Sequence, residues 1–188
     1  SKVTATGLSK TSALGTSSSW DSSPFRHRPV TLRGWVPLEQ ARERGTLEWV
    51  RPLLEAFRDR PEEDIRAAIA DMLGALKISD AAAVLADALD DPAFQAQQAD
   101  IIGFLWSCGF QSEDDLRVVV TCAVDGDFRC AMEALTWIEE LEQVLDEQVL
   151  LDALLAVRGA VEDTPKDDPR SALYASMLQA LQRLERAQ

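Results

Sequence analysis

Residues 64–92 read DIRAAIADMLGALKISDAAAVLADALDDP, and this stretch decides the fold. Its first half places Ile65, Ile69 and Leu73 at helical spacing, and its second half does the same with Val84, Leu85 and Leu89. Ser79 is expected to cap the second helix. An aspartate at the N-cap followed by a proline is typical of a helix start, so Asp91-Pro92 predicts that a third helix begins there.

The same pattern continues from Thr46 to the end of the chain. Candidate helix starts recur at Thr46, Ser79, Ser112 and Asp146, in steps of 33, 33 and 34 residues. The valine run at 118–120 is the one strand-like stretch, and its flanks favour a helix. The sequence therefore predicts an all-α protein with eight helices, near residues 46–57, 61–76, 79–89, 91–109, 112–126, 128–141, 149–157 and 168–184.

The second helix of each pair repeats residue by residue. ADMLGAL at 70–76 aligns with ADIIGFL at 99–105, an offset of 29, and a weaker echo follows in MEAL at 132–135, where Ala134 takes the place of the glycine. A period of about 30 residues is typical of a solenoid, whose end repeats are capped. Small residues at the glycine position are expected to let neighbouring helices approach closely.

The repeat also resembles a known family. Arg66, the small residues after it, Leu73-Gly74, the second apolar helix and Asp91-Pro92 are similar to the short HEAT-like repeat of the HEAT/PBS-lyase type. The resemblance implies an α-solenoid of about four stacked helix pairs whose second helices line a concave, protein-binding face. It implies no reaction. We expect this repeat domain to span residues 35–188.

Residues 1–34 differ from the rest and are expected to form an irregular arm. They carry five basic residues and one acidic residue, a net charge of +4, and few large apolar residues before residue 24. Such a segment cannot bury enough surface to offset its ordering entropy. Its aromatic and basic side chains are candidate partner contacts: Trp20, Phe25, Arg26, Arg28 and Arg33.

The remainder of the chain has 14 basic and 31 acidic residues, a net charge of −17. Such a surface repels phosphate backbones, so nucleic acid is excluded as a partner and a protein with a basic segment is favoured. The alternative is that the acid serves solubility alone. Opposite charges on the arm and the body also favour docking of the arm on its own body, a homo-oligomer, or a place in a larger assembly.

Two features of the body are further candidate contacts. Trp106 and Trp137 lie 31 residues apart at matching places in successive second helices, as binding anchors or as core between repeats. Glu139 and Glu140 belong to an acidic run at a helix end, which is either a solvated face or a dock for basic residues. The acidic residues 113–115 are expected in the first turn of a helix, where the dipole favours them.

Catalytic equipment is lacking in the sequence. His27 is the single histidine, and neither a phosphate-binding glycine loop nor a zinc-type spacing of Cys and His occurs. Residues 125–127 start like a calcium loop but lack its later ligands, which favours a tight turn. No cofactor, no metal and no enzymatic activity are therefore expected.

Composition also bears on location. Cys108, Cys122 and Cys130 sit in apolar helical contexts without a CxxC pair, which favours free thiols in a reducing compartment, the cytoplasm. No apolar run reaches the length of a membrane span or of a secretory signal, so no membrane contact is expected.

The predicted function is a non-catalytic protein-interaction scaffold, adaptor or assembly subunit. Two alternatives stay open. One is an enzyme of the HEAT-like class, such as a base-excising glycosylase or a chromophore lyase, although a glycosylase needs a basic groove for DNA. The other is that residues 1–34 act as a targeting or secretion leader.

Overall fold

The computed structural model describes residues 31–32, 36–37 and 47–187, and these residues belong to one unit, Thr31–Gln188. The predicted arm, with Trp20, Phe25, Arg26, Arg28 and Arg33, lies outside the described residues except for Thr31–Leu32. Thr31–Leu32 forms a short strand, β1, which pairs antiparallel with β2 (Val36–Pro37). Leu32 lies opposite Val36 in this pairing.

The all-α prediction is confirmed for the described part of the chain. A 3-10 turn, η1 (Leu47–Trp49), precedes α2, and a second, η2 (Pro92–Gln97), precedes α5. The α-helices are α2 (Val50–Asp59), α3 (Glu63–Leu73), α4 (Ala81–Asp90), α5 (Gln98–Ser107), α6 (Glu113–Asp125), α7 (Phe128–Glu139), α8 (Glu147–Asp163) and α9 (Arg170–Arg186).

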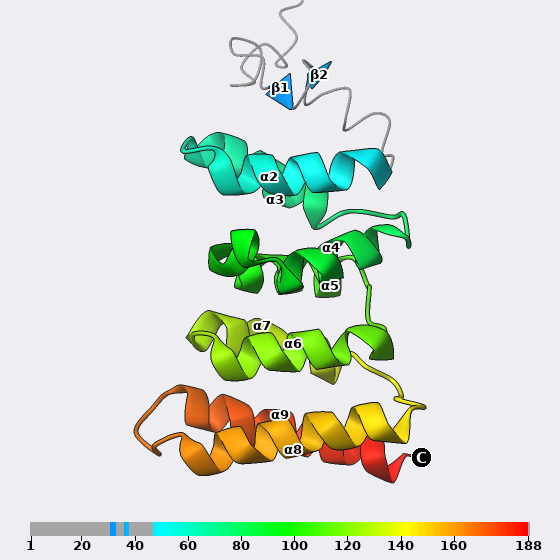
Figure 1. Ribbon diagram of the computed structural model, residues 1–188, viewed down its shortest axis with the longest axis vertical. Helices are drawn as coiled ribbons and strands as arrows, with labels where there is room; N and C mark the ends of the chain where they lie inside the picture. Colours follow the sequence, from blue (N-terminus) through cyan, green and yellow to red (C-terminus); the bar gives the residue numbers. More distant parts are fainter. Residues whose placement is uncertain (1–30, 33–35, 38–46, 188) are drawn as a thin grey trace, which may run out of the picture. The chain divides into compact units, whose positions relative to one another are not determined.

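Consecutive helices pair, and the pairs follow one another as layers (Figure 1). α2 contacts α3, α4 contacts α5, α6 contacts α7 and α8 contacts α9. Between layers, α2, α4, α6 and α8 contact one another in order, and so do α5, α7 and α9. The chain therefore forms two rows of helices, with the first helix of each pair in one row and the second in the other.

Local sequence explains most helix ends. Ser112 and Asp146 accept hydrogen bonds from backbone N–H groups of their own first turns, as predicted, and Asp127 does the same for α7. Asp91 also caps, but Pro92 opens η2 and not an α-helix. The prediction of Ser79 as a cap is wrong, because α4 begins after Asp80, whose side chain makes no capping bond.

Apolar side chains fill the space between the rows, and no polar or charged residue of the described part is buried. Polar contacts instead link the layers at their edges. The Tyr174 hydroxyl donates to the Ala123 carbonyl at 2.8 Å, and Arg170 Nη1 donates to the Gly126 carbonyl at 3.0 Å, which fixes α9 to the end of α6. The Glu113 carboxylate accepts from the backbone N–H groups of Leu145 and Asp146, linking α6 to the start of α8.

The end layer does not carry the polar cap that the sequence predicted on both of its helices. Leu151 and Leu155 of α8 are 48% and 54% exposed, and Leu145 before α8 is 71% exposed. Among the described helices, none has the length and apolar character needed to cross a bilayer.

Candidate functional site

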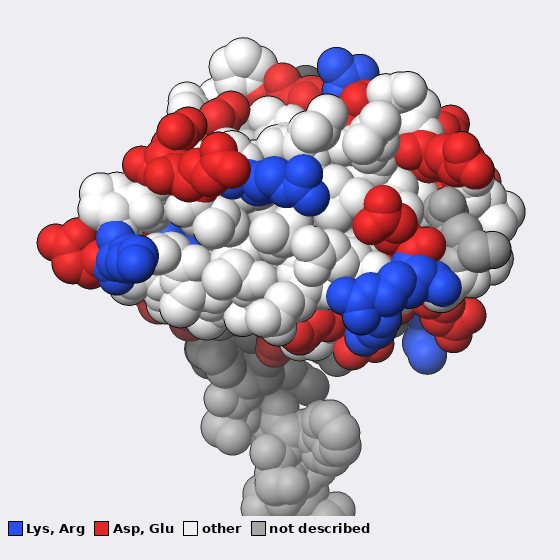
Figure 2. Space-filling view, turned by 90° about the horizontal axis from the view of Figure 1, so that it is seen from below, with Lys and Arg blue, Asp and Glu red and all other residues white. Residues whose placement is uncertain are grey.

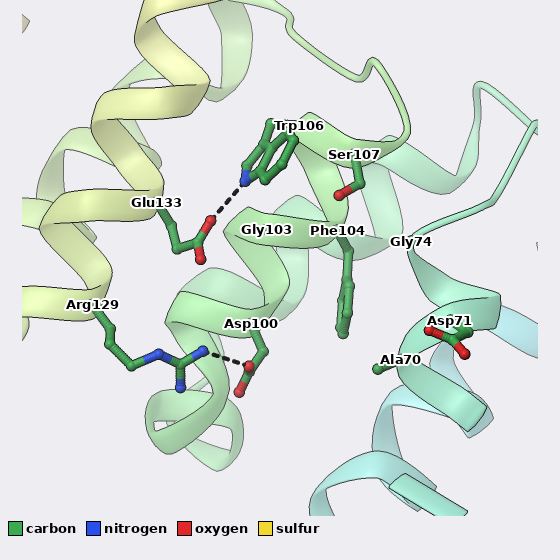
Figure 3. Close-up of a pocket in the computed structure, with 10 residues that line it drawn as sticks. All are labelled: Ala70, Asp71, Gly74, Asp100, Gly103, Phe104, Trp106, Ser107, Arg129 and Glu133. Carbon is green, nitrogen blue, oxygen red and sulfur yellow. Dashed lines mark hydrogen bonds and ion pairs between the residues drawn. The ribbon is translucent and has the colours of Figure 1, made fainter. Parts of the chain in front are cut away.

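A groove of about 380 Å³ opens on the row of second helices (Figure 3). It spans three layers, because α3, α5 and α7 each contribute side chains to it. Its lining residues are Ala70, Asp71, Gly74, Asp100, Gly103, Phe104, Trp106, Ser107, Arg129 and Glu133.

Small residues form the floor of this groove. A β-carbon added to Gly103 would meet the Glu133 carboxylate of α7 at 3.4–3.9 Å, and no other heavy atom comes nearer. The prediction that glycine brings two helix backbones together is therefore wrong at this position. The missing side chain leaves room that the Glu133 carboxylate occupies, and the rest of that room remains as the groove.

Polar side chains of α5 and α7 join across the groove. The Trp106 indole N–H donates to Glu133 Oε2 at 2.6 Å, and Arg129 Nη2 lies 2.9 Å from Asp100 Oδ1 (Figure 3). The hydrogen bond to Asp100 is the first cause that raises the pKa of the Arg129 guanidinium, followed by the charge of that carboxylate. Arg129 is mostly exposed, so this ion pair orients the groove wall more than it stabilises the fold.

The groove contains more acid than base. Three carboxylates, those of Asp71, Asp100 and Glu133, face one guanidinium, that of Arg129, which leaves a formal charge of −2. Asp71 makes no hydrogen bond or ion pair with the described residues. The arrangement can therefore accept hydrogen bonds from a cationic side chain, while the 37% exposed Trp106 ring offers an apolar surface beside it.

The two predicted tryptophans have different environments. Trp106 lies in the groove, whereas Trp137 is fully buried and donates its indole N–H to the Phe110 carbonyl at 3.0 Å. The prediction of Trp137 as a partner contact is contradicted by its burial. Its alternative reading, as core between repeats, is the one that the structure supports.

Glu139 and Glu140 lie at the end of α7 and both are exposed. Neither lines the groove. Arg183 of α9 donates to the backbone carbonyl of Glu139 at 3.2 Å and not to its carboxylate. The acidic run is therefore on the surface of the last two layers, away from the groove walls.

The thiols of the described part are poor nucleophiles. Burial is the first cause that raises the pKa of Cys122 to about 12 and that of Cys130 to about 11. The half-buried Cys108 thiol donates to the Leu73 carbonyl at 3.1 Å, and burial raises its pKa too. All three thiols are free, and no group of three or more metal-ligating side chains occurs among the described residues.

Four of the groove's charged residues were missed by the sequence analysis. Asp71, Asp100 and Arg129 are spaced by 29 and 29 residues, which is the offset between Gly74 and Gly103. Extending the glycine alignment three residues towards the N-terminus would have found this row. Glu133 follows Arg129 by one helical turn and so falls on the same side of α7.

Searches against protein-family models, curated proteins and solved structures return no match to this chain.

Proposed function

We propose that this chain is a non-catalytic interaction scaffold that holds a basic segment of a partner protein in the groove between α3, α5 and α7. The observation that carries the proposal is the Trp106–Glu133 pair at the wall of an open groove with a formal charge of −2. Tryptophan is enriched at the centres of protein interfaces, and its indole can stack on a guanidinium or ammonium group.

The proposal includes a HEAT-like solenoid as the scaffold. Its support is the pairing of consecutive helices, the two rows of contacts between layers, and the repeat of 29 residues that places Asp71 and Asp100 in one groove. A row of second helices is the surface that such a stack would offer to a partner. We further propose a cytoplasmic location, since the cysteines of the described part are free and two of them are buried.

The test compares two exposed aromatic residues. Trp106→Ala removes the groove ring, and Phe128→Ala removes a ring that is 42% exposed but does not line the groove. Tagged full-length protein and both variants would be used for affinity purification from the native lysate, with mass spectrometry as the readout. A partner lost with Trp106→Ala and kept with Phe128→Ala supports the proposal.

Equal retention of every partner by both variants would refute the groove as the binding site. A second comparison removes residues 1–34, which carry the basic and aromatic candidates Trp20, Phe25, Arg26, Arg28 and Arg33. We expect this deletion to change assembly or partner capture if the arm is a second binding element. An unchanged mass and an unchanged partner list would assign binding to the helical body alone.

A further inference from the structure

The outer side of α8 carries leucines where the matching helix α6 carries polar residues. Aligning the two helices at their N-caps places Leu151 opposite Arg117 and Leu155 opposite Thr121. All four side chains are exposed, and Leu151 and Leu155 are 48% and 54% accessible. Two leucines one helical turn apart on a solvated face are therefore specific to the last layer.

A notch follows this leucine ridge. Gly159 lies one further turn along α8, and a β-carbon added to it would meet no heavy atom within 4 Å. Leu151, Leu155 and Gly159 are spaced by four residues each, so they follow one another along one side of the helix. Glycine lowers helix propensity by about 1 kcal/mol relative to alanine, and no neighbour in the described part requires it here.

Charge favours another copy of the same chain as the partner of this strip. Residues 47–144 contain 21 acidic and seven basic residues, whereas residues 145–188 contain eight and five, so the net charges are −14 and −3. Two copies therefore repel each other least at the last layer. Figure 2, which views that end of the stack, shows a broad uncharged area with side chains of both signs around it.

We propose that two copies of this chain associate through α8, with the helices antiparallel across a two-fold axis near Leu155. In this arrangement Leu155 of one copy contacts Leu155 of the other. Leu151 of each copy then lies at the level of Gly159 of the other copy, where the missing side chain leaves room for it. One surface thus supplies both the ridge and the notch, as a two-fold interface requires.

The size of the strip predicts a weak dimer. α8 has 17 residues, which corresponds to a length of about 25 Å. A contact between two such helices falls below the roughly 1,200 Å² typical of stable complexes. We therefore expect a dissociation constant of about 10 µM, with a concentration-dependent mixture of monomer and dimer.

Sedimentation velocity of the full chain tests this, over concentrations from about 1 to 200 µM. We expect the mass to rise from 20.7 kDa towards twice that value. The double variant Leu151→Arg/Leu155→Thr copies the residues of α6, and we expect it to weaken association by at least about 100-fold. Far-UV circular dichroism and the thermal midpoint check that the variant remains folded.

A cross-linking pair provides a readout independent of stability. Leu155→Cys places a thiol at the proposed axis, and Thr121→Cys places one at the matching exposed site of α6. A short bismaleimide should join two copies of the first variant and not of the second, since Cys122 and Cys130 are buried. A wild-type monomer at about 200 µM, a dimer unaffected by the double variant, or equal cross-linking at both sites would each overturn the proposal.

Discussion

Replacing Gly126 by alanine should destabilise this protein more than any other glycine-to-alanine change in the described part. Gly126 ends α6, with φ −93° and ψ −169°, a conformation open to any residue. The cost is therefore steric. A β-carbon there would lie 2.4 Å from the Cys122 carbonyl oxygen and 2.8 and 2.9 Å from Cβ and Sγ of Cys130.

These contacts cannot relax independently. Cys122 Oβ-side backbone belongs to α6 and Cys130 to the first turn of α7, so the added methyl group forces the two helices apart. The Gly126 carbonyl also accepts the hydrogen bond from Arg170, which ties the turn to α9. Overpacking of this kind costs about 1–3 kcal/mol, and we expect the upper part of that range.

Urea denaturation followed by circular dichroism measures the effect, and Gly109→Ala and Gly159→Ala are its controls. Gly109 has φ +73° with open space around it, so alanine there should cost about 1 kcal/mol through backbone strain alone. Gly159→Ala should stabilise the monomer by about 0.5–1 kcal/mol, because α8 gains helix propensity without a clash. A Gly126→Ala variant within about 0.5 kcal/mol of the wild type would refute the steric reasoning.

Three further outcomes are expected. Trp137→Phe should lower the free energy of unfolding by about 2 kcal/mol, because it removes a buried indole and its hydrogen bond to a backbone carbonyl, and urea denaturation would show this. Burial and two neighbouring aspartates raise the pKa of Asp115 to about 6, so the folded state binds more protons between pH 4 and 6 and stability falls as pH rises through that window. Asp115→Asn should therefore gain about 1 kcal/mol relative to the wild type at pH 8 and nothing at pH 4, measured by the same titration. Cys122 and Cys130 should react with a thiol reagent at pH 8 only after unfolding, since their raised pKa values keep them protonated.

Helix existence and most helix caps followed from the sequence, because both depend on residues close together in the chain. Ser112 and Asp146 cap as predicted, since their side chains need only the backbone of the next turn. Ser79 fails because its neighbour Asp80 already has helical backbone angles, which leaves Ser79 outside the capping position. The choice between two adjacent polar residues is decided by the turn that precedes them, and not by their own propensities.

The tryptophan pair shows why contacts between layers were harder to predict. Burial in α5 and α7 matches at an offset of 29, which aligns Leu105 with Ala134, whereas Trp106 and Trp137 are 31 apart. Two residues correspond to about 200° around a helix, so the second tryptophan faces the core and the first faces the groove. The same shift corrects the prediction that Ala134 takes the place of Gly103.

The groove and the leucine strip are on different rows of helices, and this separation has a measurable consequence. The groove uses α3, α5 and α7, and the strip uses α8. A dimer through α8 would therefore keep both grooves open, and two linked grooves bind an immobilised partner more tightly than one. Surface-captured partner should retain the wild type longer than the Leu151→Arg/Leu155→Thr variant, by about 10-fold or more at high partner density. At low density the two proteins should dissociate at the same rate, because each groove is unchanged. A difference that persists at low density would mean that the leucine strip contacts the partner itself, and the division of labour between the two rows would be wrong.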